Sequence, residues 1–209
     1  MRGRAQLMLP VSVSAVEFDA EAPVAYLGGD DAIDVEHPKV QELVMHLAGQ
    51  APAPVEYARS AFTWVRDNIR HSLDAQDSRV TITASQTLHE GVGLCFAKAH
   101  LLAALLRARG IPTGLCYQRL ADGTGYCVHG LIAVHVEGVW HRQDPRGNKP
   151  GVDAQFDLTQ ERLAWPVDVD MGEVDYPQIF TAPHPKVLAS LRGADDALAL
   201  CDGGLPTQL

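Results

Sequence analysis

The amino-acid sequence predicts an α+β fold, in which a helical N-terminal part packs on an antiparallel β-sheet. Segments with helical periodicity occupy the first half of the chain, and strand-like segments separated by short polar turns follow them. With 209 residues, the chain is long enough for one domain with a substantial core. We therefore expect a single domain over residues 1–209, with its core at about residues 55–150.

Two amphipathic helices are expected in the N-terminal part. Pro38 is a favourable first helical residue, and an apolar stripe at helical spacing follows it as far as Gly49. A second helix is expected from about Val55 to Arg70, again with one apolar face that packs against a core. The positions of the two stripes are Val40, Leu43, Val44 and Leu47, then Val55, Ala58, Phe62, Val65 and Ile69.

A short helix and a buried helix come next. Thr83 and Gln86 form a capping box for the short helix, which stops at Gly91. From Cys95 to Ala108, eleven of fourteen residues are apolar. A helix that is apolar nearly all round lies in the middle of a domain, and Gly110 ends this one. Its three polar residues are Lys98, His100 and Arg107.

The remaining segments favour strands and irregular structure. Three strands are expected, over Gly114–Leu120, Tyr126–Val136 and Val139–Asp144, with polar turns between them. The alternation of apolar and small polar residues over 11–15 indicates a further strand near the N-terminus. The C-terminal part is expected to be irregular, with short helices near Thr159–Leu163 and Pro185–Arg192.

Composition excludes some classes of function. The formal net charge of -9 argues against a nucleic-acid binder, which would present a basic face. No stretch approaches the ~18 consecutive apolar residues that a membrane span needs. Polar residues interrupt the N-terminal apolar run, so it makes a poor signal peptide. We therefore expect a cytoplasmic protein that binds neither nucleic acid nor membrane, with reduced thiols.

The four cysteines do not indicate a metal or disulfide framework. They form no Cys-x-x-Cys pair, and no histidine stands at a zinc-finger spacing from them. Cys116 and Cys127 flank a predicted hairpin and could face each other, although reduced core cysteines are the preferred interpretation. We expect no metal and no cofactor.

Cys95 stands where a helix N-terminus can activate a thiol. It follows Gly91-Val92-Gly93-Leu94 and opens the buried helix. The free N–H groups and positive dipole end of that helix stabilise a thiolate. The same N–H groups can donate to an oxyanion formed when the sulfur attacks a carbonyl. The simpler interpretation is that Cys95 is a small apolar core residue, and its position alone does not exclude this.

The strand pair after residue 126 can supply a base and an acid. If Glu137-Gly138 is a two-residue turn, Val136 faces Val139, and His129 and Asp144 become diagonal neighbours on one face of the hairpin. A thiolate nucleophile needs such a base, and the base needs an orienting acid. Alone, each residue has a structural interpretation, as a hydrogen-bonded histidine and a strand-ending aspartate.

The sequence resembles the transglutaminase-like superfamily of thiol enzymes, in a bacterial branch. His129 opens a strand and Asp144-Pro145 closes the next, in the order Cys, His, Asp that this family has, with spacings of 34 and 15 residues. The clear resemblance covers about residues 55–150. Its other segments are Ala61–Arg70, Ala84–Leu88, Gly93–Lys98 and Leu105–Pro112.

The resemblance implies a papain-like fold and a catalytic triad of Cys95, His129 and Asp144. It implies acyl transfer on a peptide, protein or small amide, as a cysteine peptidase or amidase. Leu131 and Leu94 depart from the aromatic and polar residues that the family often has there, which leaves the substrate open. No calcium loop of the EF-hand type is present in the sequence, so calcium dependence is not expected.

Two other functions remain open at this point. A non-catalytic binding module that kept the fold would have an ordinary thiol at Cys95. A protein-glutamine or arylamine acyltransferase would use similar chemistry with an amine as the acceptor. Tyr117–Arg119 and Asp144–Lys149 are candidate cleft segments, although all except Asp144 are interpreted as strand surface and turn. His100 is interpreted as structural.

Overall fold

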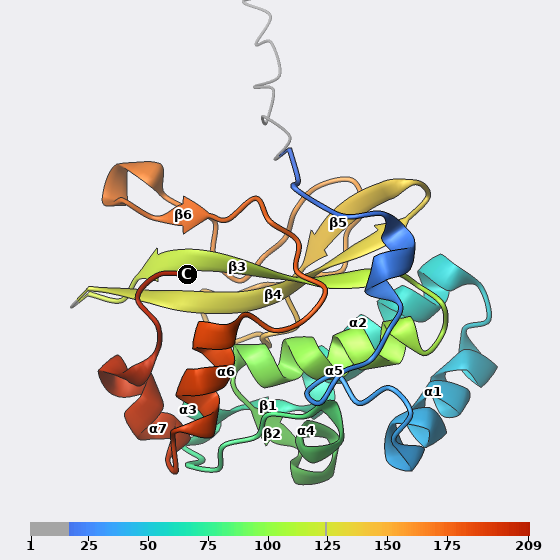
Figure 1. The fold of residues 1–209 in the computed structure, drawn as a ribbon, viewed down its shortest axis with the longest axis horizontal. Coiled ribbons are helices and arrows are strands. Elements are labelled where there is room, and N and C mark those ends of the chain that lie inside the picture. The colour runs from blue at the N-terminus through green and yellow to red at the C-terminus, as the bar shows by residue number, and fades with distance from the viewer. Residues whose placement is uncertain (1–16, 124) are drawn as a thin grey trace, which may run out of the picture.

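The computed structural model describes residues 17–123 and 125–209 as a helical layer and a β-sheet packed against each other (Figure 1). The predicted strand over residues 11–15 lies outside the described residues. The helices are α1 Pro38–Gln50, α2 Pro54–Asn68, α3 Ser72–Ala75, α4 Ala84–Glu90, α5 Cys95–Arg107, α6 Pro185–Arg192 and α7 Ala197–Ala199. The strands are β1 Arg70–His71, β2 Val92–Gly93, β3 Thr113–Ala121, β4 Tyr126–Val136, β5 Val139–Gln143 and β6 Val174–Asp175. Two short 3-10 helices and a π-type turn complete the described elements, at Pro23–Tyr26, Val169–Met171 and Leu200–Gly204.

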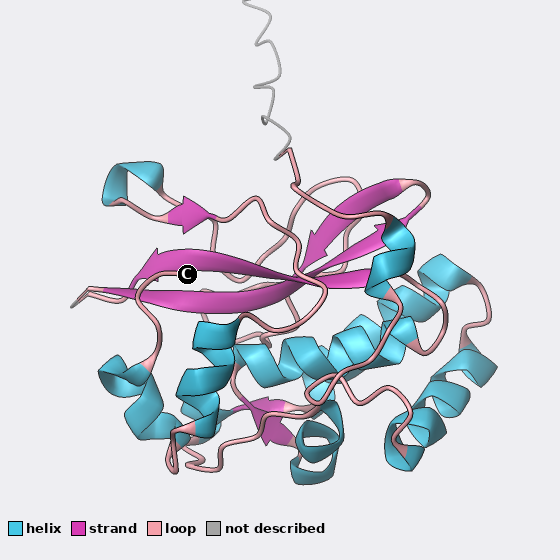
Figure 2. Ribbon diagram, viewed as in Figure 1, coloured by secondary structure: helices cyan, strands magenta, loops and turns pink. Residues whose placement is uncertain are grey.

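The main sheet has the order β5-β4-β3-β6, with antiparallel pairing throughout (Figure 2). The predicted α+β class is confirmed. Glu137 and Gly138 both have positive φ, at 53° and 83°, as a two-residue hairpin turn requires. Val136 therefore pairs with Val139, and the pairing register assumed from the sequence is confirmed. A small parallel pair, β1 with β2, lies outside this sheet.

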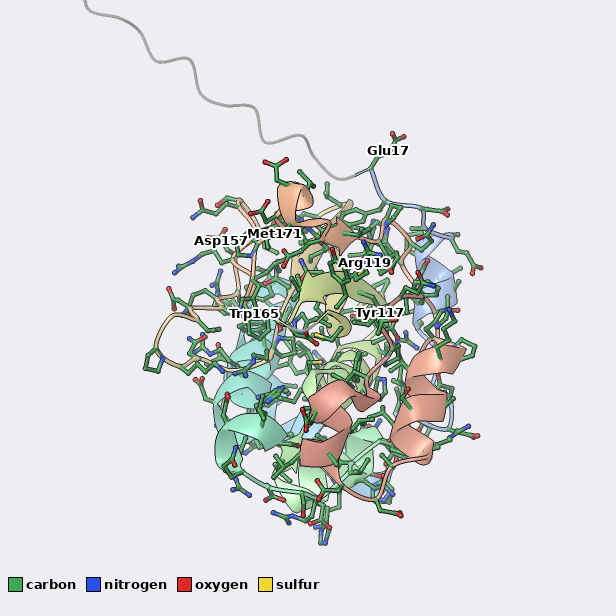
Figure 3. All side chains as sticks on the ribbon, turned by 90° about the vertical axis from the view of Figure 1, so that its left-hand side faces the viewer. Glu17, Tyr117, Arg119, Asp157, Trp165 and Met171 are labelled. Carbon is green, nitrogen blue, oxygen red and sulfur yellow. The ribbon has the colours of Figure 1, made fainter. Side chains whose placement is uncertain are left out.

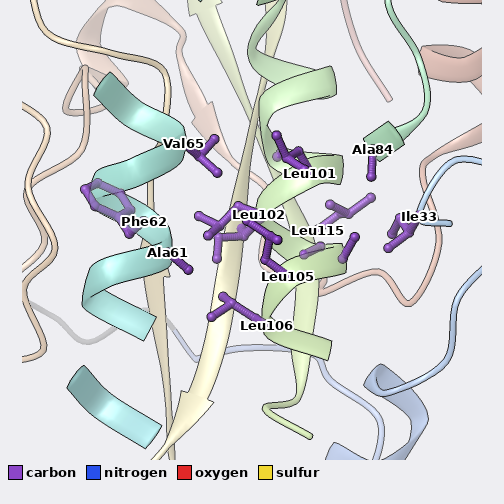
Figure 4. Close-up of a cluster of buried hydrophobic side chains, with 14 of the residues drawn as sticks. Ile33, Ala61, Phe62, Val65, Ala84, Leu101, Leu102, Leu105, Leu106 and Leu115 are labelled. Atoms are coloured by element: carbon purple, nitrogen blue, oxygen red, sulfur yellow. The ribbon is translucent and has the colours of Figure 1, made fainter. Parts of the chain in front are cut away.

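The helix that begins at Cys95 lies at the centre of the helical layer. All thirteen residues of α5 are buried, between the sheet on one side and α2 and α4 on the other. Figure 4 shows the leucines of α5 facing Ala61, Phe62 and Val65 of α2. Alternation along the strands divides the core, because β4 directs Val128 and Ile132 toward the helices and Leu131 toward the opposite face.

The polar residues of α5 fix its position through bonds to backbone carbonyls. Lys98 Nζ donates to the carbonyls of Arg66, at 3.2 Å, and Ile69, at the end of α2. His100 Nδ1 lies 2.7 Å from the carbonyl oxygen of Ile82, which supports its structural interpretation. Arg107 donates to three carbonyls, those of Gly28, Thr113 and Thr181. The free-energy cost of burying these polar groups is offset, because each of them has a hydrogen-bond partner.

Predictions for individual elements differ in their outcome. The capping box at Thr83 and Gln86 is present, and Gly91 ends α4 with a φ of 63°. The helix over Pro185–Arg192 is confirmed. The predicted helix near Thr159–Leu163 is wrong, because residues 158–163 form bends and irregular chain. There the Asp157 carboxylate accepts the N–H groups of Thr159 and Gln160, so a local turn replaces the helix.

The contact between α5 and β4 tolerates no side chain at Gly130. A Cβ atom there would lie 2.5 Å from Cδ1 of Phe96, which is 1% exposed in the core. We predict that Gly130→Ala lowers the free energy of unfolding by about 1–3 kcal/mol, because the helix must move away from the strand. Urea denaturation followed by circular dichroism measures this change.

Gly49→Ala is the matched control for this substitution. Gly49 lies in α1, where an added Cβ atom would point into open space, so alanine should raise the free energy of unfolding by roughly 0.5–1 kcal/mol. A Gly130→Ala variant as stable as the wild type would contradict the tight fit of α5 on β4.

Candidate active site

A cavity of about 360 Å³ opens beside the N-terminus of α5. Cys95 and His129 both line it, together with Trp165 from the chain after β5. Figure 3 views the molecule from this side, with Trp165 near the middle of the view. The two protein layers therefore meet at a cavity that contains the predicted nucleophile and base.

Cys95 is the first residue of α5, and the local backbone explains its position. Leu94 is the N-cap residue and its side chain caps no N–H group, so among the described residues the first N–H groups of the helix are left for another acceptor. Gly93 is required before it, because a Cβ there would lie 2.8 Å from Oγ1 of Thr81. The Sγ atom of Cys95 accepts a hydrogen bond from the N–H of Gly130, at 3.5 Å.

His129 and Asp144 form a hydrogen-bonded pair between β4 and the end of β5. Nε2 of His129 lies 2.8 Å from Oδ2 of Asp144. Because β5 ends at Gln143, the next residue leaves the ladder and turns its carboxylate toward the histidine. The other ring nitrogen, Nδ1, is not used by Asp144, and the ring lines the same cavity as Cys95. The structure therefore brings together all three residues predicted from the sequence.

Charge determines the protonation of this pair. Burial of the His129 ring lowers its pKa, but the charges of Asp144 and Cys95 and the hydrogen bonds to them outweigh that effect and raise the pKa to about 10. Burial of Asp144 raises its pKa, but His129 and the N–H groups of Ala164 and Arg146 lower it overall. The arrangement therefore favours a charged His129 imidazolium beside a charged Asp144 carboxylate.

Trp165 covers the histidine on the cavity side. Its ring meets the His129 ring edge to face, with the ring centres 5.1 Å apart and an interplanar angle of 88°. Arg146 places its guanidinium carbon 5.1 Å from the centre of the same indole. Because the neighbouring Ala164 N–H donates to Asp144, this loop both shields and orients the pair. Trp165 was not predicted from the sequence, since it lies in an irregular segment without periodicity.

The candidate cleft segments are only partly in the cavity. Tyr117–Arg119 lies in β3 and does not line it. Arg146 and Lys149, which the sequence assigned to a turn, do line it, as do Cys127 and Cys201. Cys116 and Cys127 do not face each other, because they pair with Leu131 and Leu120 respectively. All four cysteines carry free thiols.

The described residues hold neither a metal-binding cluster nor a membrane-spanning helix. Within 17–123 and 125–209, no group of three or more His, Cys, Asp or Glu residues is placed to hold a metal ion. In the same part of the chain, no helix combines the length and the apolar character that a membrane crossing requires.

Comparison with protein families identifies the family to which this fold belongs. The transglutaminase-like superfamily matches residues 41–145, half of the chain, and this range includes Cys95, His129 and Asp144. The chain therefore belongs to the transglutaminase-like superfamily. No curated protein matches the sequence.

Several solved structures have a similar arrangement at low sequence identity. A candidate cysteine protease from Cytophaga hutchinsonii is 18% identical with a TM-score of 0.49, over 63% of this chain and 46% of that protein. The periplasmic domain of TgpA from Pseudomonas aeruginosa is 17% identical with a TM-score of 0.45, over 60% of this chain and 48% of that domain. This chain thus spans less than half the length of either structure.

The His129–Asp144 pair generates a titration prediction. Replacing Asp144 with Asn removes the carboxylate that raises the pKa of His129 and leaves burial, which lowers it. We predict that the pKa of His129 falls by at least about two units in Asp144→Asn, as followed by NMR of the imidazole protons. His184, at the N-cap of α6, is the internal control and should titrate as in the wild type. An unchanged His129 titration would contradict the coupling.

Proposed function

We propose that the protein hydrolyses amide or peptide bonds by acyl transfer through Cys95, His129 and Asp144. The observation that carries this proposal is the geometry of the buried site: a sulfur at a helix N-terminus, an imidazole that lines the same cavity, and a carboxylate 2.8 Å from the imidazole. Membership of the transglutaminase-like superfamily supports the same chemistry.

The reaction follows from the protonation state of the pair. The Cys95 thiolate attacks the carbonyl carbon, and the negative charge that develops on oxygen is stabilised by the free N–H groups at the start of α5. The carbon–nitrogen bond then breaks as the His129 imidazolium gives its proton to the leaving amine. The neutral imidazole next takes a proton from water, whose oxygen attacks the thioester and releases a carboxylic acid and the thiolate.

Water is the proposed acceptor of the acyl group. Protein crosslinking requires a second large substrate to reach the thioester, whereas hydrolysis needs only water. The cavity of about 360 Å³ is at the small end of the range for ligand sites, and Cys95 is 6% exposed. Asp144 orients the ring throughout, because its carboxylate is held by two backbone N–H groups as well as by His129.

The nucleophile is tested by removing the sulfur. We predict that Cys95→Ala lowers turnover of a peptide and amide library to background, and abolishes labelling by iodoacetamide at pH 6–7. The substitution is small, so circular dichroism should show an unchanged fold. Product formation is followed by mass spectrometry.

Cys116→Ala is the matched control. Cys116 is buried on the opposite face of the sheet, where burial raises the pKa of its thiol to about 12, so its removal should change neither labelling nor turnover. Turnover that survives in Cys95→Ala would refute the nucleophile assignment. Turnover found in neither protein, with an ordinary unreactive thiol at Cys95, would support a binding module instead.

A further inference from the structure

The cavity beside Cys95 has a cationic end that the proposed reaction does not use. Most of its wall is apolar, with Leu73, Leu94, Leu120, Val128 and Leu205 among the lining residues. At one end, however, three nitrogen-bearing side chains from separate segments line the same space. They are His71 of β1, and Arg146 and Lys149 of the chain that follows β5.

Two nitrogen atoms at this end are buried without a protein partner. Nε of Arg146 and Nδ1 of His71 are shielded from solvent and make no hydrogen bond within the described residues. Arg146 is 1% exposed, and its guanidinium is held by Asp74 and by the Trp165 ring. Leaving a buried donor unsatisfied costs about 1–3 kcal/mol, so Arg146 and His71, which both line the cavity, retain unused hydrogen-bonding capacity beside it.

The local charge favours an anion. Arg146 and Lys149 share one carboxylate, that of Asp74, through two bonds from the guanidinium and one of 3.0 Å from the ammonium. Burial of Asp74 raises its pKa, but these bonds lower it to about 2, so the carboxylate stays charged. At this end two cations therefore face one anion, whereas the acidic lining residues Asp122 and Glu173 come from the segments that adjoin β3 and β6. Burial and the charge of Arg146 lower the pKa of His71 to about 3, so its ring is neutral and carries one N–H group to donate.

The cationic end lies next to the triad, because Arg146 is close to Asp144 in the chain and contacts the Trp165 ring. Arg146 follows Asp144 by two residues, and its N–H donates to the Asp144 carboxylate at 3.0 Å. Its guanidinium lies over the ring of Trp165, and the same ring contacts His129. A group bound here would thus be held close to the carbonyl that Cys95 attacks.

We propose that His71, Arg146 and Lys149 form a subsite for a carboxylate of the substrate, so that the enzyme prefers acidic peptides or amides. This inference rests on the proposed function and names its substrate class. The carboxylate can belong to an acidic side chain on the acyl side or to the leaving-group side of the scissile bond. In either case a substrate carboxylate accepts hydrogen bonds from the cavity-lining side chains of Arg146, Lys149 and His71, next to the Asp74 carboxylate that Arg146 and Lys149 already share.

Matched covalent probes test the subsite directly on the full chain. The first pair is two peptidyl vinyl sulfones that differ only in Glu against Gln next to the reactive group. The second pair carries the carboxylate on the sulfone, as a carboxyphenyl against a carboxamidophenyl group. The second-order rate of Cys95 alkylation is measured by intact-protein mass spectrometry. In one of the two pairs, we expect the acidic probe to react at least about tenfold faster than its neutral counterpart. A preference in the first pair assigns the carboxylate to the acyl side of the scissile bond, and a preference in the second pair assigns it to the leaving-group side.

Variants connect the preference to these residues. Lys149→Ala should reduce the rate ratio of acidic to neutral probe several-fold, because one cation is lost. Asp74→Asn should instead increase the ratio, since it removes the competing carboxylate and leaves both cations. Lys39→Ala is the control, because Lys39 is also an exposed lysine paired with a carboxylate, Glu42, but lies on α1 outside the cavity. Its ratio should equal that of the wild type.

The outcomes separate the two proposals. If neutral and acidic probes label Cys95 at equal rates, or if Asp74→Asn lowers the ratio in a protein that melts as the wild type does, the carboxylate subsite is overturned and the nucleophile stands. If no probe labels Cys95 while it labels a papain standard, the proposed function itself fails.

Discussion

The active-site geometry depends on how closely the N-terminal turn of α5 approaches β4. Gly130 leaves room for the Phe96 ring, and its N–H group then reaches the sulfur of Cys95. One residue earlier on the strand, His129 lines the same cavity as Cys95. A side chain at Gly130 would push α5 away from β4. Cys95 would then move away from both the Gly130 N–H group and His129, because both of these lie on β4. The buried polar groups of α5 reinforce this spacing by bonding to carbonyls of three neighbouring segments.

Asp144 supplies the second constraint, because it is a fully buried carboxylate beside a buried imidazole. Burial alone would favour the neutral forms of both groups. Two backbone N–H groups, from Arg146 and Ala164, stabilise the charged carboxylate, and the carboxylate in turn stabilises the imidazolium. Lys98 is a further titratable group near Asp144, and its pKa is lowered to about 7 mainly by burial. The loop that contains Ala164 and Trp165 is thus part of the site, although it has no regular secondary structure.

Local sequence patterns encode a large part of this fold. The apolar stripes of α1 and α2, the capping box at Thr83 and the buried character of α5 follow from spacing alone. The pairing of His129 with Asp144 was predictable because a two-residue turn at Glu137-Gly138 fixes the register of the whole hairpin. His71 and Trp165 were missed, since they reach the cavity through long-range contacts that no short pattern records. The helix expected near Thr159–Leu163 does not form, because the Asp157 carboxylate accepts the backbone N–H groups of Thr159 and Gln160 and holds a turn there.

His129 and Asp144 are proposed to keep the sulfur of Cys95 ionised inside the protein. The pH dependence of Cys95 alkylation by iodoacetamide, compared between the wild type and His129→Ala, tests this proposal most directly. We predict a wild-type rate at pH 6 within about threefold of the rate at pH 8, and a fall of about two orders of magnitude over the same range in His129→Ala, as for an ordinary thiol. A wild-type rate that falls as steeply as that of the variant would contradict it.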